Sequence, residues 1–160
     1  MGTMRELWRS VWIARAGGYR ADAMARVLIV DDQPDLREAL VAVVEADGHE
    51  IFEAGDGAEA VVQALRQRPD IVLMDGNMAG VNGFEALRRL KADPKTRRVP
   101  VIMVTVLDDA GARNRATELG AEGYVTKPWG DGELEWRIRQ VLTASAASAG
   151  NRRYTGAPLL

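Results

Sequence analysis

The sequence contains no cysteine and only one histidine in its 160 residues. Without cysteine, the chain has neither disulfide bonds nor thiolate metal sites, which fits a reducing cytoplasm. Its apolar runs are far shorter than the roughly 20 residues that a membrane-spanning helix needs. The formal net charge is only −2, so composition gives no reason to expect nucleic acid or an anionic membrane as the main partner. We therefore expect a cytoplasmic protein with no transmembrane segment and no DNA binding.

The chain does contain short apolar runs that end abruptly in polar residues. Four runs, the last of them weaker, behave in this way: residues 27–30 lead into Asp31 and Asp32, residues 71–74 into Asp75, residues 101–104 into Thr105, and residues 123–126 into Lys127. Residues 71–74 are the clearest case, because four large apolar residues without polar alternation suit a strand buried on both faces. These runs predict the strands of a parallel sheet in an α/β protein.

Helical patterns alternate with these runs along the chain. They cover residues 34–48, 56–68, 82–93, 108–119 and 131–142, and residues 49–54 are typical of an additional edge strand. Strict alternation of five strands and five helices predicts a doubly wound parallel sheet, because βαβ crossovers are right-handed. In the second helix we expect four residues to face inward: Ala58, Val61, Val62 and Leu65. His49, at the start of the edge strand, is expected to be a surface residue.

The polar ends of parallel strands emerge at one edge of the sheet, where open α/β folds place their ligand sites. Asp31, Asp32, Asp75, Thr105 and Lys127 should therefore meet in one crevice. Carboxylates at close range repel each other and tend to hold protons unless a cation lies among them. This composition predicts a site for a divalent metal ion. Taken alone, the acid pair would also suit a helix N-cap, and Thr105 a plain strand end.

These residues, together with Tyr124 and with Pro128 directly after Lys127, resemble the motifs of the receiver domain of two-component response regulators. The resemblance covers roughly residues 25 to 142, nearly all of the chain that we expect to be ordered. Residues 91–100 are also similar to receivers that precede diguanylate cyclase output domains, although no such output domain fits here. We therefore expect the fold and chemistry of a receiver.

The two ends of the chain do not fit the receiver pattern. Residues 1–24 are expected to form an extension with a short amphipathic helix, whose Trp8 and Trp12 would anchor it to a partner, to the domain or to a membrane surface. A mostly disordered extension, or a start site placed too early, is the alternative. Residues 25–143 would form the receiver domain, and residues 144–160, rich in Ala, Ser and Gly, a disordered tail.

The resemblance implies a flavodoxin-like sheet of order 2-1-3-4-5, with Asp75 as the phosphoryl acceptor. It implies that Asp32, Asp75 and the main-chain carbonyl of Asn77 ligate Mg²⁺, and that Asp31 reaches the ion through water. Oxygen ligands of this kind suit Mg²⁺, which takes one or two carboxylates and keeps its waters. Ala79 departs from the family, which usually has proline in its Met-Pro-Gly loop, so this loop should be less stiff.

The resemblance also implies that Thr105 and Lys127 hold phosphoryl oxygens, and that the peptide bond between Lys127 and Pro128 is cis. Such groups suit phosphoryl transfer, which needs positioning and neutralisation of charge. We hypothesise that the phosphoryl group draws the Thr105 hydroxyl inward and that Tyr124 turns from outside to inside. A plain edge aromatic is the alternative for Tyr124. The face that would change shape consists of three neighbouring elements, at residues 108–119, 123–126 and 131–142.

The resulting hypothesis is a stand-alone receiver that accepts a phosphoryl group on Asp75 from a sensor histidine kinase or a histidine phosphotransfer protein. It would catalyse its own phosphoryl transfer and a slow dephosphorylation, without being an enzyme in the ordinary sense. Its downstream partner is a protein of unknown identity, and a homodimer is a further option. Trp136 suits an interface anchor or a lone surface aromatic. A DNA-binding output is disfavoured, because only a short tail follows Leu142.

The sequence is also compatible with two other functions. A phosphorylation-independent interaction module would bind its partner through the N-terminal helix. A phosphatase of the haloacid dehalogenase type also uses an aspartate after a strand, but that family has a second aspartate two positions later. This chain has Asn77 there, which disfavours the phosphatase.

Overall fold

The computed structural model describes residues 24–154, which form one five-stranded parallel sheet of order β2-β1-β3-β4-β5. The strands are β1 (Arg26–Val30), β2 (Glu50–Ala54), β3 (Ile71–Met74), β4 (Val101–Thr105) and β5 (Gly123–Thr126). This order confirms the flavodoxin-like fold expected from the sequence. Because the strand order reverses beside β1, open sheets of this kind leave a crevice at the carboxyl ends of β1 and β3.

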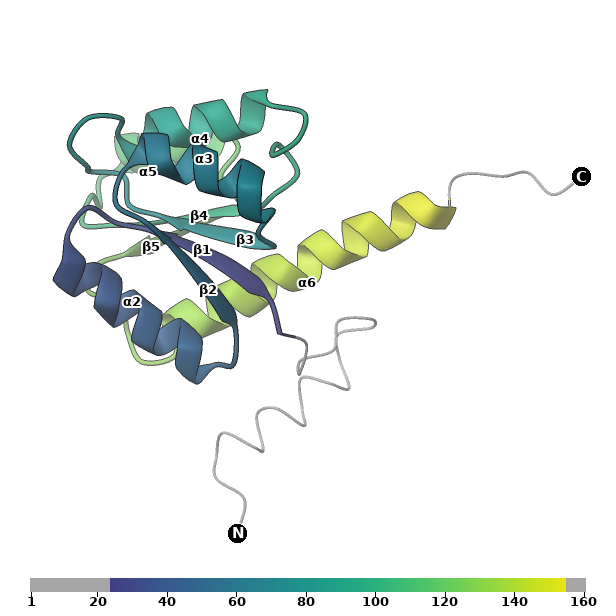
Figure 1. Ribbon diagram of the computed structural model, residues 1–160, viewed down its shortest axis with the longest axis horizontal. Coiled ribbons are helices and arrows are strands. Elements are labelled where there is room, and N and C mark those ends of the chain that lie inside the picture. The colour runs from purple at the N-terminus through teal and green to yellow at the C-terminus, as the bar shows by residue number, and fades with distance from the viewer. Residues whose placement is uncertain (1–23, 155–160) are drawn as a thin grey trace, which may run out of the picture.

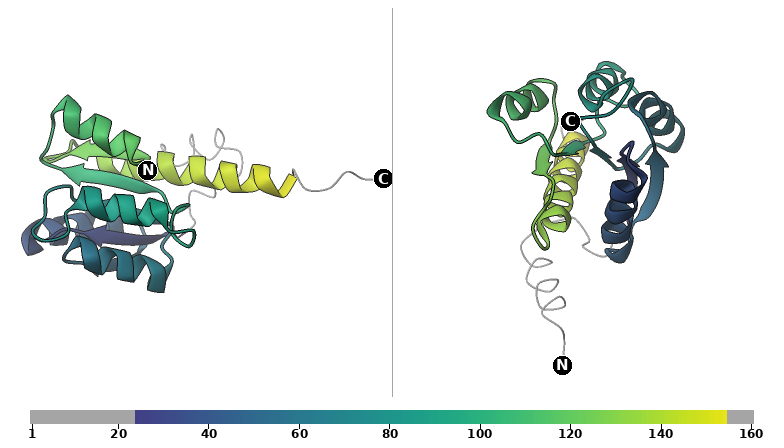
Figure 2. Two further views of the ribbon diagram at one scale, coloured as in Figure 1. Left: turned by 90° about the horizontal axis from the view of Figure 1, so that it is seen from above. Right: turned by 90° about the vertical axis from the view of Figure 1, so that its left-hand side faces the viewer.

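Within the described residues, five helices cover the sheet: α2 (Pro34–Ala46), α3 (Gly57–Gln67), α4 (Gly83–Ala92), α5 (Ala110–Glu118) and α6 (Glu133–Tyr154). Helices α2 and α6 lie on one face, and α3, α4 and α5 lie on the other (Figures 1 and 2). Neighbouring strand residues point to opposite faces. Val27 and Ile29 pack with α2 and α6, whereas Leu28 and Val30 pack with the other three helices. Both faces of the sheet are therefore buried, as its apolar strands predict.

Side-chain caps fix the starts of several helices. Oδ1 of Asp56 accepts the N–H of Glu59 at 2.8 Å, and Oε2 of Glu59 accepts the N–H of Gly55 at 2.8 Å. At the start of α4, Oδ1 of Asn82 accepts the N–H of Glu85 at 3.0 Å. These caps satisfy N–H groups that have no partner inside the first helical turn. The Asn82 cap thus fixes the end of the loop between β3 and α4 to the start of α4.

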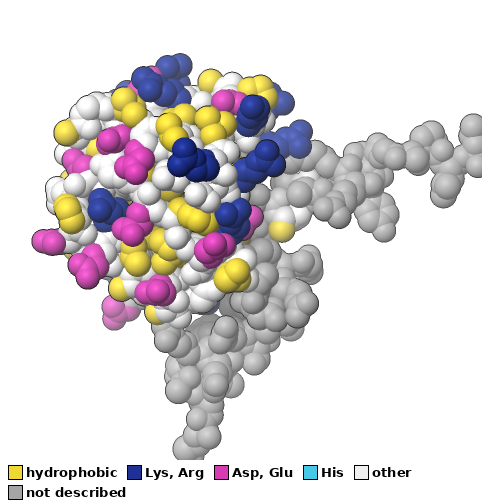
Figure 3. Space-filling view, in the orientation of Figure 1, with side chains coloured by type: hydrophobic (Ala, Val, Ile, Leu, Met, Phe, Trp, Pro, Cys, Tyr) yellow, Lys and Arg dark blue, Asp and Glu magenta, His cyan; other side chains and the backbone are white. Residues whose placement is uncertain are grey.

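The inward face of α3 agrees with the prediction only in part. Val61 packs against the core as expected, whereas Ala58 is exposed, and Val62 and Leu65 are 51% and 37% exposed. The buried residues of this helix are Gly57, Ala60 and Ala64. Small residues face inward because α3 packs closely: a Cβ at Gly57 would lie 2.3 Å from a main-chain oxygen before α4. On the face seen in Figure 3, hydrophobic side chains lie in small groups between charged side chains of both signs. Exposed apolar residues scattered in this way are ordinary on a protein surface.

His49 is largely buried, contrary to the prediction of a surface residue. Its side chain is 8% exposed, and its Nδ1 accepts the N–H of Ala25 at 3.1 Å. Its Nε2 lies 3.4 Å from Oδ2 of Asp47. Gly48, at a φ of +88°, turns the chain after α2 and directs His49 toward the start of β1. The imidazole therefore closes the amino-terminal end of β1.

Residues 144–154, the described part of the segment predicted to be a disordered tail, instead continue the last helix. Helix α6 extends to Tyr154, and its second half projects beyond the sheet (Figures 1 and 2). Alanine has the highest helix propensity, and lengthening an existing helix avoids the cost of nucleation. Residues 144–148, which are mostly exposed, therefore prolong the helix.

The predicted amphipathic helix of residues 1–24 lies, except for Met24, outside the described residues. Among the helices of residues 24–154, none combines the length and the apolar character needed to cross a membrane.

Candidate functional site

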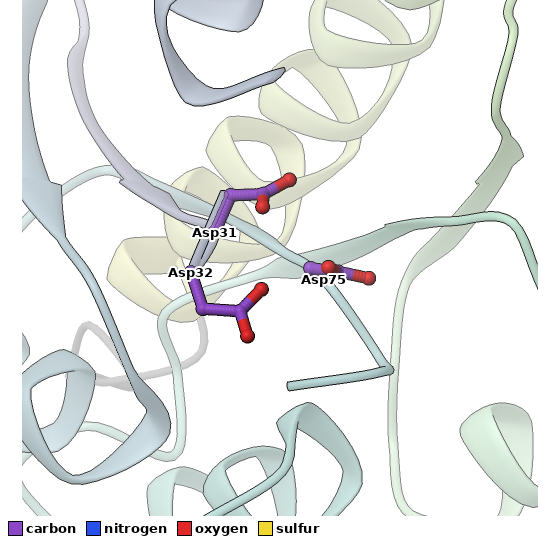
Figure 4. A group of neighbouring side chains, drawn as sticks. All are labelled: Asp31, Asp32 and Asp75. Carbon is purple, nitrogen blue, oxygen red and sulfur yellow. The ribbon is translucent and has the colours of Figure 1, made fainter. Parts of the chain in front are cut away.

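The three predicted acids meet at the carboxyl edge of the sheet. Asp31 and Asp32 follow β1, and Asp75 follows the neighbouring strand β3 (Figure 4). One carboxylate oxygen from each lies within 4.8 Å of the other two. Asp31 and Asp75 are buried, with exposed fractions of 0% and 5%. Three carboxylates this close repel each other unless positive charge is placed among them.

Lys127 supplies part of that positive charge. Its Nζ lies 2.5 Å from Oδ2 of Asp31 and 3.6 Å from Oδ2 of Asp75. The N–H of Lys127 donates to the carbonyl of Thr105 at 2.8 Å, which ties the end of β5 to the end of β4. The peptide bond between Lys127 and Pro128 is cis, as the resemblance implies. The ammonium group is therefore held at the same edge of the sheet as the acids.

Both carboxylate oxygens of Asp31 already have protein partners. Oδ1 accepts the N–H of Gln33 at 2.9 Å, and Oδ2 contacts Lys127. The guanidinium of Arg37 donates to the Asp31 carbonyl at 2.8 Å and pairs with Glu53 at 3.0 Å, which fixes the loop after β1. An acid engaged in this way suits contact with a metal ion through water rather than directly.

Asp32 has one oxygen with no partner. Oδ2 accepts the N–H of Ala79 at 3.3 Å, whereas Oδ1 is buried and forms no hydrogen bond. Burial of an unsatisfied charged oxygen is costly, and a bound cation removes that cost. Carboxylate oxygens that converge beside a main-chain loop are also the donors that Mg²⁺ prefers. The residues present therefore fit a divalent cation.

The Asp75 carboxylate is held by the loop that follows it. Its Oδ1 accepts the N–H of Asn77 at 3.1 Å. Burial raises the pKa of Asp75, and the negative charge of Asp31 adds to this rise. The Asn77 hydrogen bond, Lys127 and the Thr105 hydroxyl act in the opposite direction and lower that pKa. Asp75 is thus a partly desolvated carboxylate with donors on several sides.

Thr105 and Tyr124 both contact Leu107 in the loop after β4. Thr105 is fully buried, and its Oγ1 accepts the N–H of Leu107 at 3.4 Å. The hydroxyl of half-buried Tyr124 donates to the carbonyl of the same Leu107 at 2.6 Å. The guanidinium of Arg113 lies 4.7 Å from the centre of the Tyr124 ring. Both side chains named by the sequence therefore contact one short loop segment.

Sequence reasoning missed the residues that surround Tyr124. Nη2 of Arg113 contacts Oδ1 of Asp108 at 2.5 Å and donates to the hydroxyl of Thr126 at 2.7 Å. This network joins α5 to β5 and to the loop after β4. Asp108 and Arg113 are five residues apart, which is not the three- or four-residue spacing of helical pairs. The sequence therefore carries no local signal for the network.

A mainly apolar pocket of 330 Å³ lies beside the acids and was also not anticipated. It is lined by Leu36, Val106, Lys127, Pro128 and Trp129. Val106, one of these lining residues, is 57% exposed. The surface adjoining Lys127 therefore offers apolar contact area to a binding partner.

Comparison with known proteins identifies the family. The family model described as the response regulator receiver domain matches residues 27–139. Protein PilH of Pseudomonas aeruginosa is 42% identical over 119 residues, which are 74% of this chain and 98% of PilH. Response regulator PleD of Caulobacter vibrioides is also 42% identical, over 117 residues that are 73% of this chain but only 26% of PleD.

Solved structures agree with this assignment. The receiver domain of the sensor histidine kinase PA1611 of Pseudomonas aeruginosa was solved with a magnesium ion coordinated in its active-site cleft. It is 31% identical, with a TM-score of 0.70, over 75% of this chain and 98% of that one. Chemotaxis protein CheY4 of Vibrio cholerae is 29% identical, with a TM-score of 0.70, over 74% of this chain and 99% of that one. From its sequence and its fold, this chain belongs to the response regulator receiver domain family.

Proposed function

We propose that this chain accepts a phosphoryl group on Asp75 from a sensor histidine kinase or a histidine phosphotransfer protein in the cytoplasm. The phosphorylated form would then signal to a downstream protein through a changed binding face. The observation that carries the proposal is the convergence of Lys127, Asp31, Asp32 and Asp75 at one edge of the sheet, with a buried Asp32 oxygen that has no partner.

In the proposed reaction, an oxygen of the Asp75 carboxylate attacks the phosphorus of a phosphohistidine. The O–P bond forms while the P–N bond breaks, and the histidine nitrogen keeps the electron pair of that bond. The product is an acyl phosphate on Asp75. A carboxylate is a competent nucleophile for this step, and phosphoryl transfer asks the protein mainly for alignment and charge neutralisation.

The residues around Asp75 would supply these two requirements. The Asn77 N–H fixes Oδ1 of the carboxylate, and Oδ2, which faces Lys127, would attack the phosphorus. The Lys127 ammonium and the Thr105 hydroxyl would bind phosphoryl oxygens as charge moves onto them. Asp32, Asp75 and the Asn77 carbonyl would hold Mg²⁺, with Asp31 through water, and the ion supplies positive charge against the phosphoryl oxygens.

The apolar pocket beside Lys127 supports a protein rather than a small molecule as the usual phosphoryl donor. Leu36, Val106 and Trp129 line it, so a partner that covers them would bury apolar area beside Lys127. Covering the pocket would also exclude water from the acceptor, which strengthens every charge interaction within it.

The proposed switch begins at Thr105. A phosphoryl oxygen that recruits the Thr105 hydroxyl would draw it from the Leu107 N–H, a contact that is already long at 3.4 Å. Tyr124, whose hydroxyl is bonded to the Leu107 carbonyl, would respond to any shift of that loop. The affected face consists of α5, β5 and α6. A phosphoryl group moves this equilibrium only by as much as it prefers one arrangement over the other.

The test is to incubate the protein with acetyl phosphate, with and without Mg²⁺, and to measure phosphoryl uptake as the increase in mass of the intact protein. We expect the wild-type protein to gain one phosphoryl group with Mg²⁺ and little without it. The Asp75→Asn variant should gain none. Equal uptake by both proteins would refute Asp75 as the acceptor, and no uptake by either would favour an interaction module that works without phosphorylation.

A further inference from the structure

The loop after β3 reaches back to the acid pair through one main-chain group. The N–H of Ala79 donates to Oδ2 of Asp32 at 3.3 Å, across 47 positions of sequence. This contact joins the loop that follows β3 to the loop that follows β1. The bond therefore fixes the loop that carries Ala79 relative to the loop that carries Asp32.

Each of the three acids has one oxygen bound by a main-chain N–H. Asp31 is bound by the amide of Gln33 at 2.9 Å and Asp75 by that of Asn77 at 3.1 Å. Both of these donors lie two positions after their acid, so they are local turns. Ala79 is different, because its amide comes from another loop. Asp32 consequently depends on the position of that loop for its orientation.

The second carboxylate oxygen has different neighbours in the three acids. For Asp31 and Asp75 it faces Lys127, at 2.5 Å and 3.6 Å. For Asp32 it is buried and forms no hydrogen bond. The Ala79 amide therefore holds Asp32 by one oxygen and leaves the second oxygen available to a cation.

We propose that the main-chain N–H of Ala79 is a positioning group of the Mg²⁺ site, which orients Asp32 so that its Oδ1 is available to the ion. This inference rests on the proposed function. A donor that fixes a metal ligand reduces the reorganisation needed on binding, and loss of such a partner typically costs roughly 10- to 100-fold in metal affinity. Because the bond is long, we place the effect at the lower end, about tenfold.

One substitution can remove this N–H donor with little disturbance of the main-chain conformation. Proline has no N–H, so Ala79→Pro deletes the hydrogen bond. Gly80, the next residue, has a φ of +73°, as at the third position of a type II turn, and proline is favoured immediately before such a residue. Ala79→Pro should thus fold and should unfold at equal or higher urea concentration than wild type, because proline restricts the unfolded chain. Ala79→Ser, which keeps the N–H, is the matched control.

The experiment is a calorimetric titration of metal-free protein with Mg²⁺ alone. We expect Ala79→Ser to bind like wild type and Ala79→Pro to bind about tenfold more weakly, although it is no less stable. An ester in place of the residue 79 amide, which removes the same N–H without proline, should reproduce the loss. Unchanged or tighter binding in both the proline and the ester variants would overturn the inference.

The titration of wild type separates this inference from the proposed function. If wild type binds Mg²⁺ and loses binding in Asp32→Asn, but the two residue 79 variants bind normally, only the role of the Ala79 amide is refuted. If wild type shows no saturable Mg²⁺ binding, the metal site fails, and the proposed Mg-dependent reaction fails together with this inference.

Discussion

Nζ of Lys127 lies 2.5 Å from Oδ2 of Asp31, although 96 positions separate the two residues in the sequence. Both side chains are nearly inaccessible to solvent, with exposed fractions of 6% and 0%. Loss of one member of a buried ion pair leaves the other without compensation, and this costs far more than loss of a surface pair. The contact therefore stabilises the fold as well as the arrangement of the site.

We predict that Lys127→Met lowers the free energy of unfolding by about 3 kcal/mol, because the charge of Asp31 is left buried without its partner. Urea denaturation in metal-free buffer measures the change. The double variant with Asp31→Asn should recover much of the loss, since it removes the stranded charge. Equal stability of the single and double variants would show that the uncompensated charge of Asp31 is not the cause of the loss.

The stability of the metal-free protein should depend on the charge of Asp75. Burial raises the pKa of this group in the folded state, so folding favours its protonated form. The stability gained by protonation is fully present below the unfolded-state pKa, near 3.8, and is lost as pH rises through the folded-state pKa. At neutral pH we therefore expect Asp75→Asn to be more stable than wild type.

Urea denaturation at a series of pH values checks this prediction. The advantage of Asp75→Asn should shrink as the pH falls toward 3.8 and should also shrink when Mg²⁺ is added at pH 7. Asp131→Asn, at an exposed position, controls for the loss of one negative charge. A variant that is less stable than wild type at pH 7 would contradict the expected sign.

Gly83 should be indispensable to the position of Asp75. A Cβ at this residue would lie 1.8 Å from the Asp75 carbonyl oxygen, so alanine cannot be accommodated without moving the main chain. We expect Gly83→Ala to lower the free energy of unfolding by about 2 kcal/mol or more and to impair phosphoryl uptake. In Gly130→Ala the added carbon meets only a flexible Glu133 side chain at 3.6 Å, and it should leave both properties nearly unchanged.

Arg113 should hold the Tyr124 ring in place. Its guanidinium lies over the ring at 4.7 Å and also contacts Asp108 and Thr126. We expect Arg113→Ala to increase the mobility of the ring and to cost about 1 kcal/mol of stability. NMR spectra of Tyr124 in the unphosphorylated protein measure the mobility.

Arg115 provides a control on the same helix, because its guanidinium lies 4.7 Å from the ring of Phe84 instead. Arg115→Ala should leave the signals of Tyr124 unchanged. Identical Tyr124 spectra for wild type and Arg113→Ala would mean that the hydrogen bond to Leu107 alone positions the ring.

Much of the sheet and its acid cluster was predictable from the sequence. Runs such as residues 71–74 signal a buried strand because they have no polar alternation, and the topology then brings their polar ends to one edge. Asp31, Asp32 and Asp75 converge as expected. The prediction succeeds because it needs only the chain direction of parallel strands and the residue type at each strand end.

Other features depend on contacts that no residue type encodes. The amide of Ala79 binds Asp32 through the main chain, and any residue except proline supplies the same N–H. The inward face of α3 was predicted only in part, because close packing selects small residues such as Ala60 over larger apolar ones such as Val62. The last helix was predicted too short because an Ala-rich segment lacks periodicity yet continues a helix readily.

The most direct test of the account is to locate the phosphoryl group in the chain. Borohydride reduces an acyl phosphate of aspartate to homoserine, which peptide mass spectrometry can place at a single position. After treatment of the wild-type protein with acetyl phosphate and Mg²⁺, we predict homoserine at position 75 and nowhere else. Homoserine at position 31 or 32, or its absence from all three positions, would contradict the account.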